Sequence, residues 1–306
     1  MNVDEFPRIP LGRWVSDFID WVIEYLGAFF DVIAAIFLGL YTGAQWLLTT
    51  PPFWVIIIVI AGIAWLAKGY KLAIGSVIGL LLIAAMGQWT HAMQTLALTL
   101  VAVLIAVVIA IPLGIWAARS QTVSTIVRPI LDFLQTMPAF VYLIPAIFLF
   151  SVGVVPGIVA TILFAIAPGV RLTELGIRGV DKEVVEAGNA FGATPGRILR
   201  QIQLPLARPS IMAGVNQVIM LSLSMAVIAS MVGAPGLGAD IIQALSRINI
   251  ALGFEAGLSV VIIAMILDRI TGAFAGTGRP RRTRGSSGAP ADEQPAPADE
   301  PEAARA

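Results

Sequence analysis

The chain contains no cysteine, a single histidine and few charged residues. Without cysteine there is no disulfide, no thiol nucleophile and no cysteine-based metal site. Only 12% of the residues are charged, whereas about 25% are charged in a typical soluble domain. Hydrophobic residues make up 58% and the mean hydropathy is +0.89, so the composition indicates an integral membrane protein. The net charge of zero gives no indication of nucleic-acid binding.

The patterns of an enzyme or a nucleotide-binding protein are also absent from the sequence. No GxxxxGK[ST] pattern occurs, so the chain has no P-loop to bind ATP phosphates. No HExxH pattern and no cluster of carboxylates falls within an apolar run. The one histidine, His91, falls at a predicted outer loop, where we expect a solvated side chain rather than a ligand. We therefore predict no catalytic residue, no metal site and no cofactor in this chain.

Apolar runs alternate with short polar connections after Pro51 and Pro52. A membrane span needs about 20 apolar residues, with about 17 as the lower limit. The first two runs are short and close together, which predicts a tight helical hairpin. The predicted fold is an all-α polytopic membrane helical bundle with about seven transmembrane helices. These fall at residues 53–67, 72–87, 95–117, about 138–151, about 155–170, about 212–232 and 256–274.

Residues 11–48 are apolar but carry an acidic stripe. Asp17, Asp20, Glu24 and Asp31 fall within one narrow arc of a helix at about 100° per residue. A carboxylate inside the bilayer is costly, so we favour an amphipathic helix lying in the membrane interface. The alternative is a spanning helix whose acidic stripe packs against protein.

Lys and Arg residues in the connections predict the orientation, since short cytoplasmic loops are enriched in both. With seven spans, the basic segments all fall on one side, which places the N-terminus outside and the C-terminus in the cytoplasm. The basic segments are 68–71, 118–136, 171–211 and 279–284. The predicted divisions are an extracytoplasmic or interfacial segment (1–52), a transmembrane domain (53–275) and a disordered cytoplasmic tail (276–306).

The polar connection 171–211 contains two short helices according to its pattern. Helical periodicity runs from 183 to 191, and Gly192 is a C-terminal stop. Thr194 and Pro195 then begin a second helix, which we expect to end at Leu204 and Pro205. Small residues on the first helix would let its backbone press into a groove of a partner. The alternative is an ordinary cytoplasmic loop.

This connection resembles the EAA loop of ABC importer permeases. The pattern is Glu-Ala-Ala, three residues, Gly, nine residues, Ile, one residue, Leu-Pro. The matching positions here are Glu186, Ala187, Gly188, Gly192, Ile202, Leu204 and Pro205. Gly188 departs from the pattern, because the family has Ala there; the substitution weakens the helix slightly but keeps the position small.

The resemblance extends from about residue 50 to 272 and indicates the permease subunit of glycine betaine/proline betaine importers. Pro235 is a departure, since the family usually has Gly at that position. The segments that carry the similarity are 131–142, 203–207, 211–217, 221–225 and 233–238.

The resemblance implies a multi-pass protein of the bacterial cytoplasmic membrane that is not itself an enzyme. Two permease copies would form the path, and a separate extracytoplasmic binding protein would deliver the substrate. Separate ATPase subunits would bind ATP and Mg²⁺ and dock on the EAA loop. The substrate would be a quaternary-ammonium compatible solute such as glycine betaine or proline betaine, with choline and carnitine as alternatives.

Polar and soft side chains suggest a translocation path. Within 212–232, one helical face carries Gln217, Met220 and Ser224. Gln135 and Tyr142 are seven residues apart, and we expect them to share a second face. Alternatively, Gln217 and Ser224 hydrogen-bond a neighbouring helix.

Two other function classes fit the composition without the motif. They are a channel of the mechanosensitive kind and a membrane scaffold that transports nothing. An ATPase that co-purifies with the chain would argue against the channel, and ATP-dependent uptake would argue against the scaffold.

Overall fold

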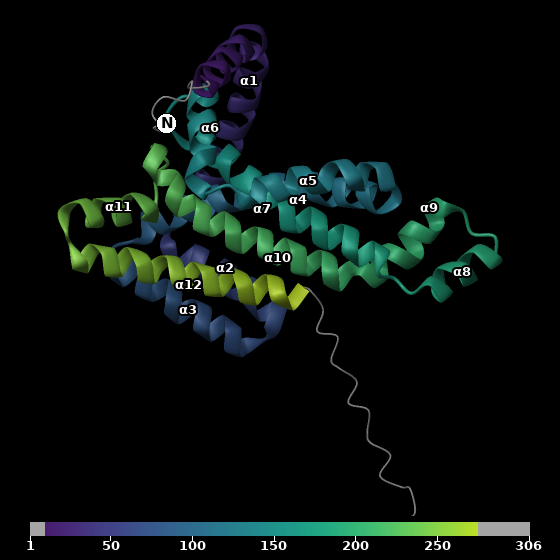
Figure 1. Cartoon of the computed structure of the whole chain (residues 1–306). Helices are drawn as coiled ribbons and strands as arrows, with labels where there is room; N and C mark the ends of the chain where they lie inside the picture. Colours follow the sequence, from purple (N-terminus) through teal and green to yellow (C-terminus); the bar gives the residue numbers. More distant parts are fainter. Residues whose placement is uncertain (1–9, 275–306) are drawn as a thin grey trace, which may run out of the picture. The chain divides into compact units, whose positions relative to one another are not determined.

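The computed structural model describes residues 10–274, and every regular element in this range is helical (Figure 1). The predicted tail, 276–306, lies outside the described residues. The α-helices are α1 (Leu11–Thr49), α2 (Phe53–Lys68), α3 (Tyr70–Ala85), α4 (Trp89–Arg119), α5 (Gln121–Thr136), α6 (Leu143–Phe150), α7 (Val154–Arg178), α8 (Lys182–Ala190), α9 (Pro195–Ile198), α10 (Leu204–Ala229), α11 (Leu237–Arg247) and α12 (Ile250–Phe274). Short 3₁₀ segments η2 (Ala139–Tyr142) and η4 (Ser230–Val232) and the π-helical η3 (Leu199–Gln203) complete the elements of the described residues.

The core is built where α4, α7 and α10 pack together. Glycines at the crossings let the backbones approach. A Cβ added at Gly114 would lie 2.6 Å from the Cβ of Thr173, and one at Gly169 would lie 2.9 Å from the Cβ of Ala110. Small residues at such crossings are how helices gain close packing in lipid, where apolar burial gives little advantage.

The count of candidate spans differs from the predicted seven. Five helices are long and apolar enough to cross a membrane, or six if the bent pair of α5 with η2 and α6 counts as one span. α2 and α3, which we counted as two spans, have 16 residues each. At about 1.5 Å per residue they reach roughly 24 Å, short of a hydrocarbon core of about 30 Å. The five are α1, α4, α7, the helical stretch 195–232 that contains α10, and α12.

α1 is one continuous helix whose two parts differ. Its N-terminal part, up to Asp31, carries the four exposed acidic residues of the predicted stripe. Residues 32–49 include no charged residue, and Tyr41 is buried there against α4 residues such as Leu98. In Figure 1, α1 crosses the long helices rather than running alongside them. The interfacial placement thus stays a prediction for the N-terminal part, while residues 32–49 belong to the packed bundle.

The connection 118–136, predicted as a polar loop, is largely the helix α5. The chain bends sharply after α5, and the following segment, 139–150, makes an angle of 109° with α5. Met137 is extended (ψ 135°) directly before Pro138, as expected for a residue that precedes proline. The prediction that Gln135 and Tyr142 share one helical face is wrong, because they lie on opposite sides of this bend.

At the end of the bundle where α4 begins, the side chain of His91 is 45% exposed, so it is partly solvated as predicted, but it also has a partner that the sequence did not indicate. The Nδ1 atom of His91 pairs with a carboxylate oxygen of Asp240 on α11. Asp240 is 7% exposed. One turn further along α4, the hydroxyl of Thr95 accepts a hydrogen bond from the backbone N–H of Leu237. Together these contacts fix the start of α11 to α4.

Candidate functional site

The EAA-like segment begins with α8, a helix capped at both ends. A side-chain oxygen of Asp181 accepts a hydrogen bond from the N–H of Glu183 at 2.9 Å. At the other end, Gly192 has φ +73°. The N–H of Gly192 donates to Asn189, and the N–H of Ala193 donates to Gly188. This is a Schellman motif with glycine at its left-handed position, so the predicted stop at Gly192 is confirmed.

The second helix begins at Thr194 and Pro195, as predicted, but it does not end at Leu204. α9 passes into the π-helical η3 and then directly into α10. Pro205 stands in the first turn of α10, where its missing N–H leaves one hydrogen bond of the preceding turn unmade. A widened π turn just before it accommodates that loss. The EAA-like segment is therefore rigidly continuous with a membrane helix.

The motif residues divide into a structural pair and an outward surface. Gly188 is buried, and a Cβ added there would lie 2.8 Å from the Cδ1 atom of Ile202. The close approach of Gly188 to Ile202 packs α8 against η3. Together α8, α9 and η3 (residues 182–203) form one unit, which we call the α8 unit. Glu186 and Ala187 are exposed on the other side of α8. The first two motif positions are thus available to a partner, whereas Gly188 and Ile202 hold the unit together.

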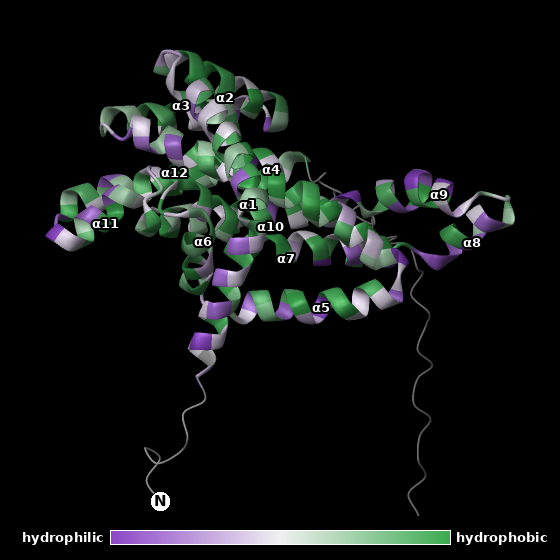
Figure 2. Ribbon diagram, turned by 90° about the horizontal axis from the view of Figure 1, so that it is seen from above, coloured by the Kyte–Doolittle hydropathy of each residue, from purple (hydrophilic) through white to green (hydrophobic). Residues whose placement is uncertain are grey.

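Phe191 is a surface feature that sequence reasoning missed. It is 91% exposed, directly before Gly192 at the tip of the unit. In Figure 2, hydrophilic residues gather on α8 and α9, whereas α2 and α4 are mainly hydrophobic. A fully exposed aromatic ring in a polar setting is costly in water and is typical of residues that anchor a protein interface. A bulky residue between small ones, in Asn-Ala-Phe-Gly, was the available signal.

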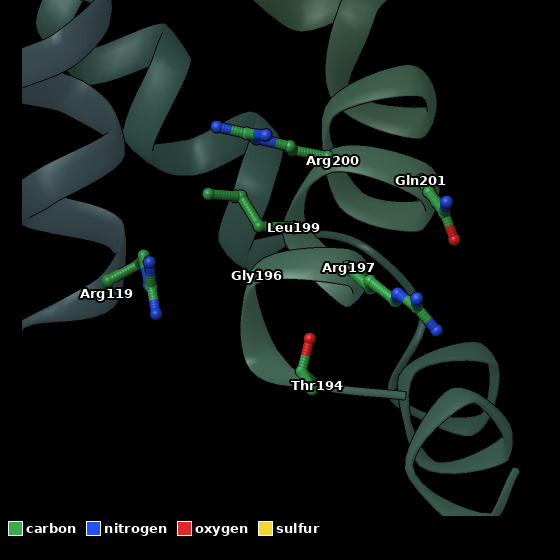
Figure 3. A pocket seen from close by; sticks show the side chains of 7 residues that line it. All are labelled: Arg119, Thr194, Gly196, Arg197, Leu199, Arg200 and Gln201. Atoms are coloured by element: carbon green, nitrogen blue, oxygen red, sulfur yellow. The ribbon is translucent and has the colours of Figure 1, made fainter. Parts of the chain in front are cut away.

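Beside this unit lies a cavity of about 480 Å³ with a positively charged lining (Figure 3). Arg119 at the end of α4, Arg197 of α9 and Arg200 of η3 are among its lining residues, and in Figure 3 the side chains of Arg197 and Arg200 extend in opposite directions. No carboxylate is among the residues that line this cavity. Three guanidinium groups without a counter-charge in their cavity favour an acidic partner.

A buried carboxylate, Glu174, joins α5 to α7 near the end of α7. Glu174 is 3% exposed and lies on α7, one turn before that helix ends. Its Oε1 atom accepts hydrogen bonds from the Ser124 hydroxyl at 2.7 Å and from Arg128 Nη2 at 2.8 Å. It also pairs with Arg178 Nε at 3.2 Å. Sequence reasoning missed this cluster; the only signal was the spacing of Arg171, Glu174 and Arg178 on one helical face.

The predicted path residues are only partly brought together. On α10, Gln217, Met220 and Ser224 are exposed along one face, and so is Gln135 at the end of α5. Tyr142 is buried instead, and its hydroxyl donates to the carbonyl of Leu134. Its ring packs edge-on against Phe164. The hydroxyl of Ser224 donates to the carbonyl of Met220 within its own helix at 3.1 Å rather than to a neighbouring helix.

Within residues 10–274, no group of three histidine or carboxylate side chains is placed to hold a metal ion. Asp268 on α12 instead accepts a hydrogen bond from the Asn216 side chain on α10 at 3.0 Å. The hydroxyl of Thr271 donates to the same asparagine at 2.6 Å. These hydrogen bonds join α10 to α12, and the α8 unit is therefore the main candidate for a functional site.

Comparisons with known proteins agree with this geometry. Residues 110–277 match the family described as binding-protein-dependent transport system inner membrane component. The glycine betaine transport system permease protein OpuAB of Bacillus subtilis is 48% identical over 88% of this chain and 95% of its own length. The glycine betaine/proline betaine permease ProW of Escherichia coli is 47% identical over 91% of this chain and 78% of its own.

A third relative is the glycine betaine/carnitine transport permease GbuB of Listeria monocytogenes, which is 49% identical over 88% of this chain and 96% of its own length. Among solved structures, the inward-facing MetNI methionine ABC transporter matches with a TM-score of 0.53 and 25% identity, over 60% of this chain and 94% of the matched chain. An ABC transporter permease of this kind works with an ATPase and a binding protein. The chain is therefore a multi-pass inner-membrane permease, not itself an ATPase, and belongs to the family of binding-protein-dependent transport system inner membrane components.

Proposed function

We propose that this permease moves glycine betaine or proline betaine into the cell, driven by ATP that separate subunits hydrolyse. The observation that carries the proposal is the α8 unit, which is capped at both ends, exposed on one side and continuous with a membrane helix. Its relatives from Bacillus subtilis, Escherichia coli and Listeria monocytogenes are named as glycine betaine permeases, and the one from Listeria is also named for carnitine. Carnitine is thus the second substrate to consider.

The partner of the α8 unit is the ATPase subunit, which holds the ATP and Mg²⁺. Glu186 and Ala187 face outward on α8, and the exposed ring of Phe191 is the anchor of the contact. The cavity lined by Arg119, Arg197 and Arg200 suits carboxylates of the same partner. Closure of two ATPase subunits around ATP would move two such units together and turn the path outward.

The path lies between two copies of the permease. Gln217, Met220 and Ser224 form an uncharged exposed face on α10, and Gln135 is exposed at the end of α5. Such groups offer weak, passable contacts to a zwitterion, whereas tight capture belongs to the extracytoplasmic binding protein. Tyr142 acts indirectly, because the hydrogen bond from its hydroxyl to the carbonyl of Leu134 stabilises the bend next to Gln135.

The α8 unit faces the cytoplasm, and the end of the bundle where α4 begins faces outward. Phe53 at the start of α2 stacks edge-on with Trp89 at the start of α4. The opposite ends of these two helices therefore point the same way and carry Lys68 and Arg119. This agrees with the enrichment of basic residues on the cytoplasmic side. The acidic N-terminal part of α1 lies in the outer interface.

Single cysteines test the orientation and the path, because the chain has no cysteine of its own. An impermeant thiol reagent added outside should label Leu245→Cys on α11, and should label Phe191→Cys only after the membrane is opened. Gln217→Cys should change its labelling rate by about tenfold between nucleotide-free and ATP-bound complexes, within the usual range of coupling between sites. An equal labelling rate of Gln217→Cys in the nucleotide-free and ATP-bound complexes would argue that Gln217 does not line the path.

Uptake by the whole complex tests the proposed function. Vesicles that contain the permease with its ATPase and binding protein should accumulate labelled glycine betaine only when ATP is inside. Unlabelled proline betaine and carnitine, added one at a time, rank the substrates by competition. Uptake without ATP that follows osmotic downshift would identify a channel instead, and stoichiometric assembly with no uptake would favour a scaffold.

A further inference from the structure

α5 is joined to the rest of the described chain along one face. Its polar residues Gln121, Ser124, Arg128 and Asp132 recur at spacings of three and four, so they line one stripe of the helix. Each pairs with a residue on α7: Arg178, Glu174, Glu174 and Arg171, respectively. The opposite face, which includes Ile126, Ile130 and Phe133, is exposed.

Glu174 is the centre of this stripe. Its side chain is 4% exposed, whereas the side chains of Arg128 and Arg178 are 49% and 31% exposed. A buried carboxylate is tolerated only when its charge and its lone pairs are satisfied. Here one oxygen receives Ser124 and Arg128 from α5 and Arg178 from α7 itself. Separation of α5 from α7 would remove two of these three partners, so the two helices have a strong preference to move together.

α7 also leads directly to the α8 unit. Only Gly179, Val180 and Asp181 separate the two helices, and Val180 is buried. Ile177, three residues after Glu174, packs against Leu199 of η3. A displacement of the α8 unit therefore reaches the end of α7 within one helical turn of Glu174.

From these contacts we propose that Glu174 is a positioning residue that makes α5 follow the α8 unit, so that ATP-driven movement reaches the bend beside Gln135. The inference rests on the proposed function, because it takes the α8 unit as the docking site of the ATPase. It assigns a role in coupling to α5, which the EAA-like motif does not contain. The exposed pair of Asp132 with Arg171 is secondary, since a solvated ion pair contributes little.

The test compares Glu174→Gln with wild type in the reconstituted complex of permease, ATPase and binding protein. Glutamine keeps the size and one acceptor oxygen but removes the charge that holds two guanidinium groups. We expect the ATPase to remain bound, while transport per ATP hydrolysed falls by about tenfold, within the ordinary range of coupling between two sites. Thr125→Ala on α5 is the matched control, because the hydroxyl of this exposed residue bonds only the carbonyl of Gln121 in its own helix.

A double-mutant cycle separates coupling from simple loss of structure. Arg128→Gln alone should lower transport per ATP severalfold, but it should add almost nothing in the Glu174→Gln background, because the pair acts as a unit. If the Glu174→Gln permease does not assemble, Arg128→Gln alone still tests the pair, because the side chain of Arg128 is half exposed and its replacement should not prevent folding. Additive losses from the two substitutions would overturn the proposal.

Spin labels give a readout that does not depend on transport. Labels at Phe133→Cys on α5 and Leu175→Cys on α7, both exposed, should give one narrow distance in wild type and a broadened one in Glu174→Gln. An unchanged distance, or transport per ATP within twofold of wild type, would contradict the proposed role of Glu174. If the ATPase instead docks elsewhere, replacement of both exposed residues Glu186 and Phe191 will leave the ATPase bound and stimulated, whatever the effect of Glu174→Gln.

Discussion

Replacement of Glu186 by Lys is expected to abolish substrate-stimulated ATP hydrolysis while the permease still inserts and folds. Glu186 is exposed on α8 and makes no hydrogen bond or ion pair within the described residues, so its loss removes nothing from the permease itself. At a docked interface, a reversed charge meets groups arranged for a carboxylate, and we expect affinity for the ATPase to fall by about 100-fold. The measurement is ATPase activity of the reconstituted complex with and without loaded binding protein.

Gln243→Lys provides the control for this charge change. Gln243 is exposed on α11, at the opposite end of the bundle from α8. A lysine placed there should leave stimulation within twofold of wild type. Wild-type stimulation in the Glu186→Lys complex would mean that α8 docks without Glu186, and the outward surface would then have to be redrawn around Phe191.

Gly114→Leu is expected to disrupt assembly of the bundle. A Cβ at this position already lies 2.6 Å from the Cβ of Thr173 and 2.7 Å from the carbonyl oxygen of Val170. Backbone cannot yield as a flexible side chain can, so α4 and α7 must separate. We expect a loss of roughly 3 kcal/mol or more, seen as a fall of about 10 °C in the midpoint of thermal aggregation. Fluorescence-detected size-exclusion chromatography after heating measures it.

The matched substitution is Gly62→Leu on α2. No atom lies within 4 Å of a Cβ added at Gly62, so a leucine there meets open space. Its midpoint should stay within about 2 °C of wild type, a change of less than roughly 1 kcal/mol. An equal loss in both variants would show that leucine disturbs insertion generally and that the crossing of α4 and α7 is not tightly packed.

The EAA-like segment was the part of the structure that the sequence predicted best. Its boundaries depend on local interactions: the Asp181 cap, the left-handed Gly192 and the Thr194–Pro195 start are all set by residues within one helical turn. Such helix start and stop signals can be recognised in the sequence, because the residues that form them lie at fixed spacing. The continuation of the second helix into α10 was missed, because a proline near its start normally suggests a boundary and the π turn that absorbs it has no simple sequence pattern.

α5 shows the opposite situation. Its sequence has polar and basic residues that read as a loop, because an isolated segment gives no indication that Arg128 will find Glu174 46 positions away. The same holds for His91, whose partner Asp240 is separated from it by 149 positions. Pairings over such distances depend on how α4, α7 and α11 are placed, and hydropathy does not encode that placement.

The sequence by itself determined that this is a helical membrane protein, where its long apolar helices lie, and which segment resembles an ATPase-docking loop. The first two properties follow from composition and periodicity, and the third follows from residues that match a known motif at fixed spacing. Only the tertiary structure decided the number of candidate spans, the bend before η2, the burial of Tyr142 and the contacts of Glu174 with α5. Each of these depends on which helix faces meet, and helix pairing in lipid depends on close packing and buried polar partners, because apolar burial between helices gives little advantage there.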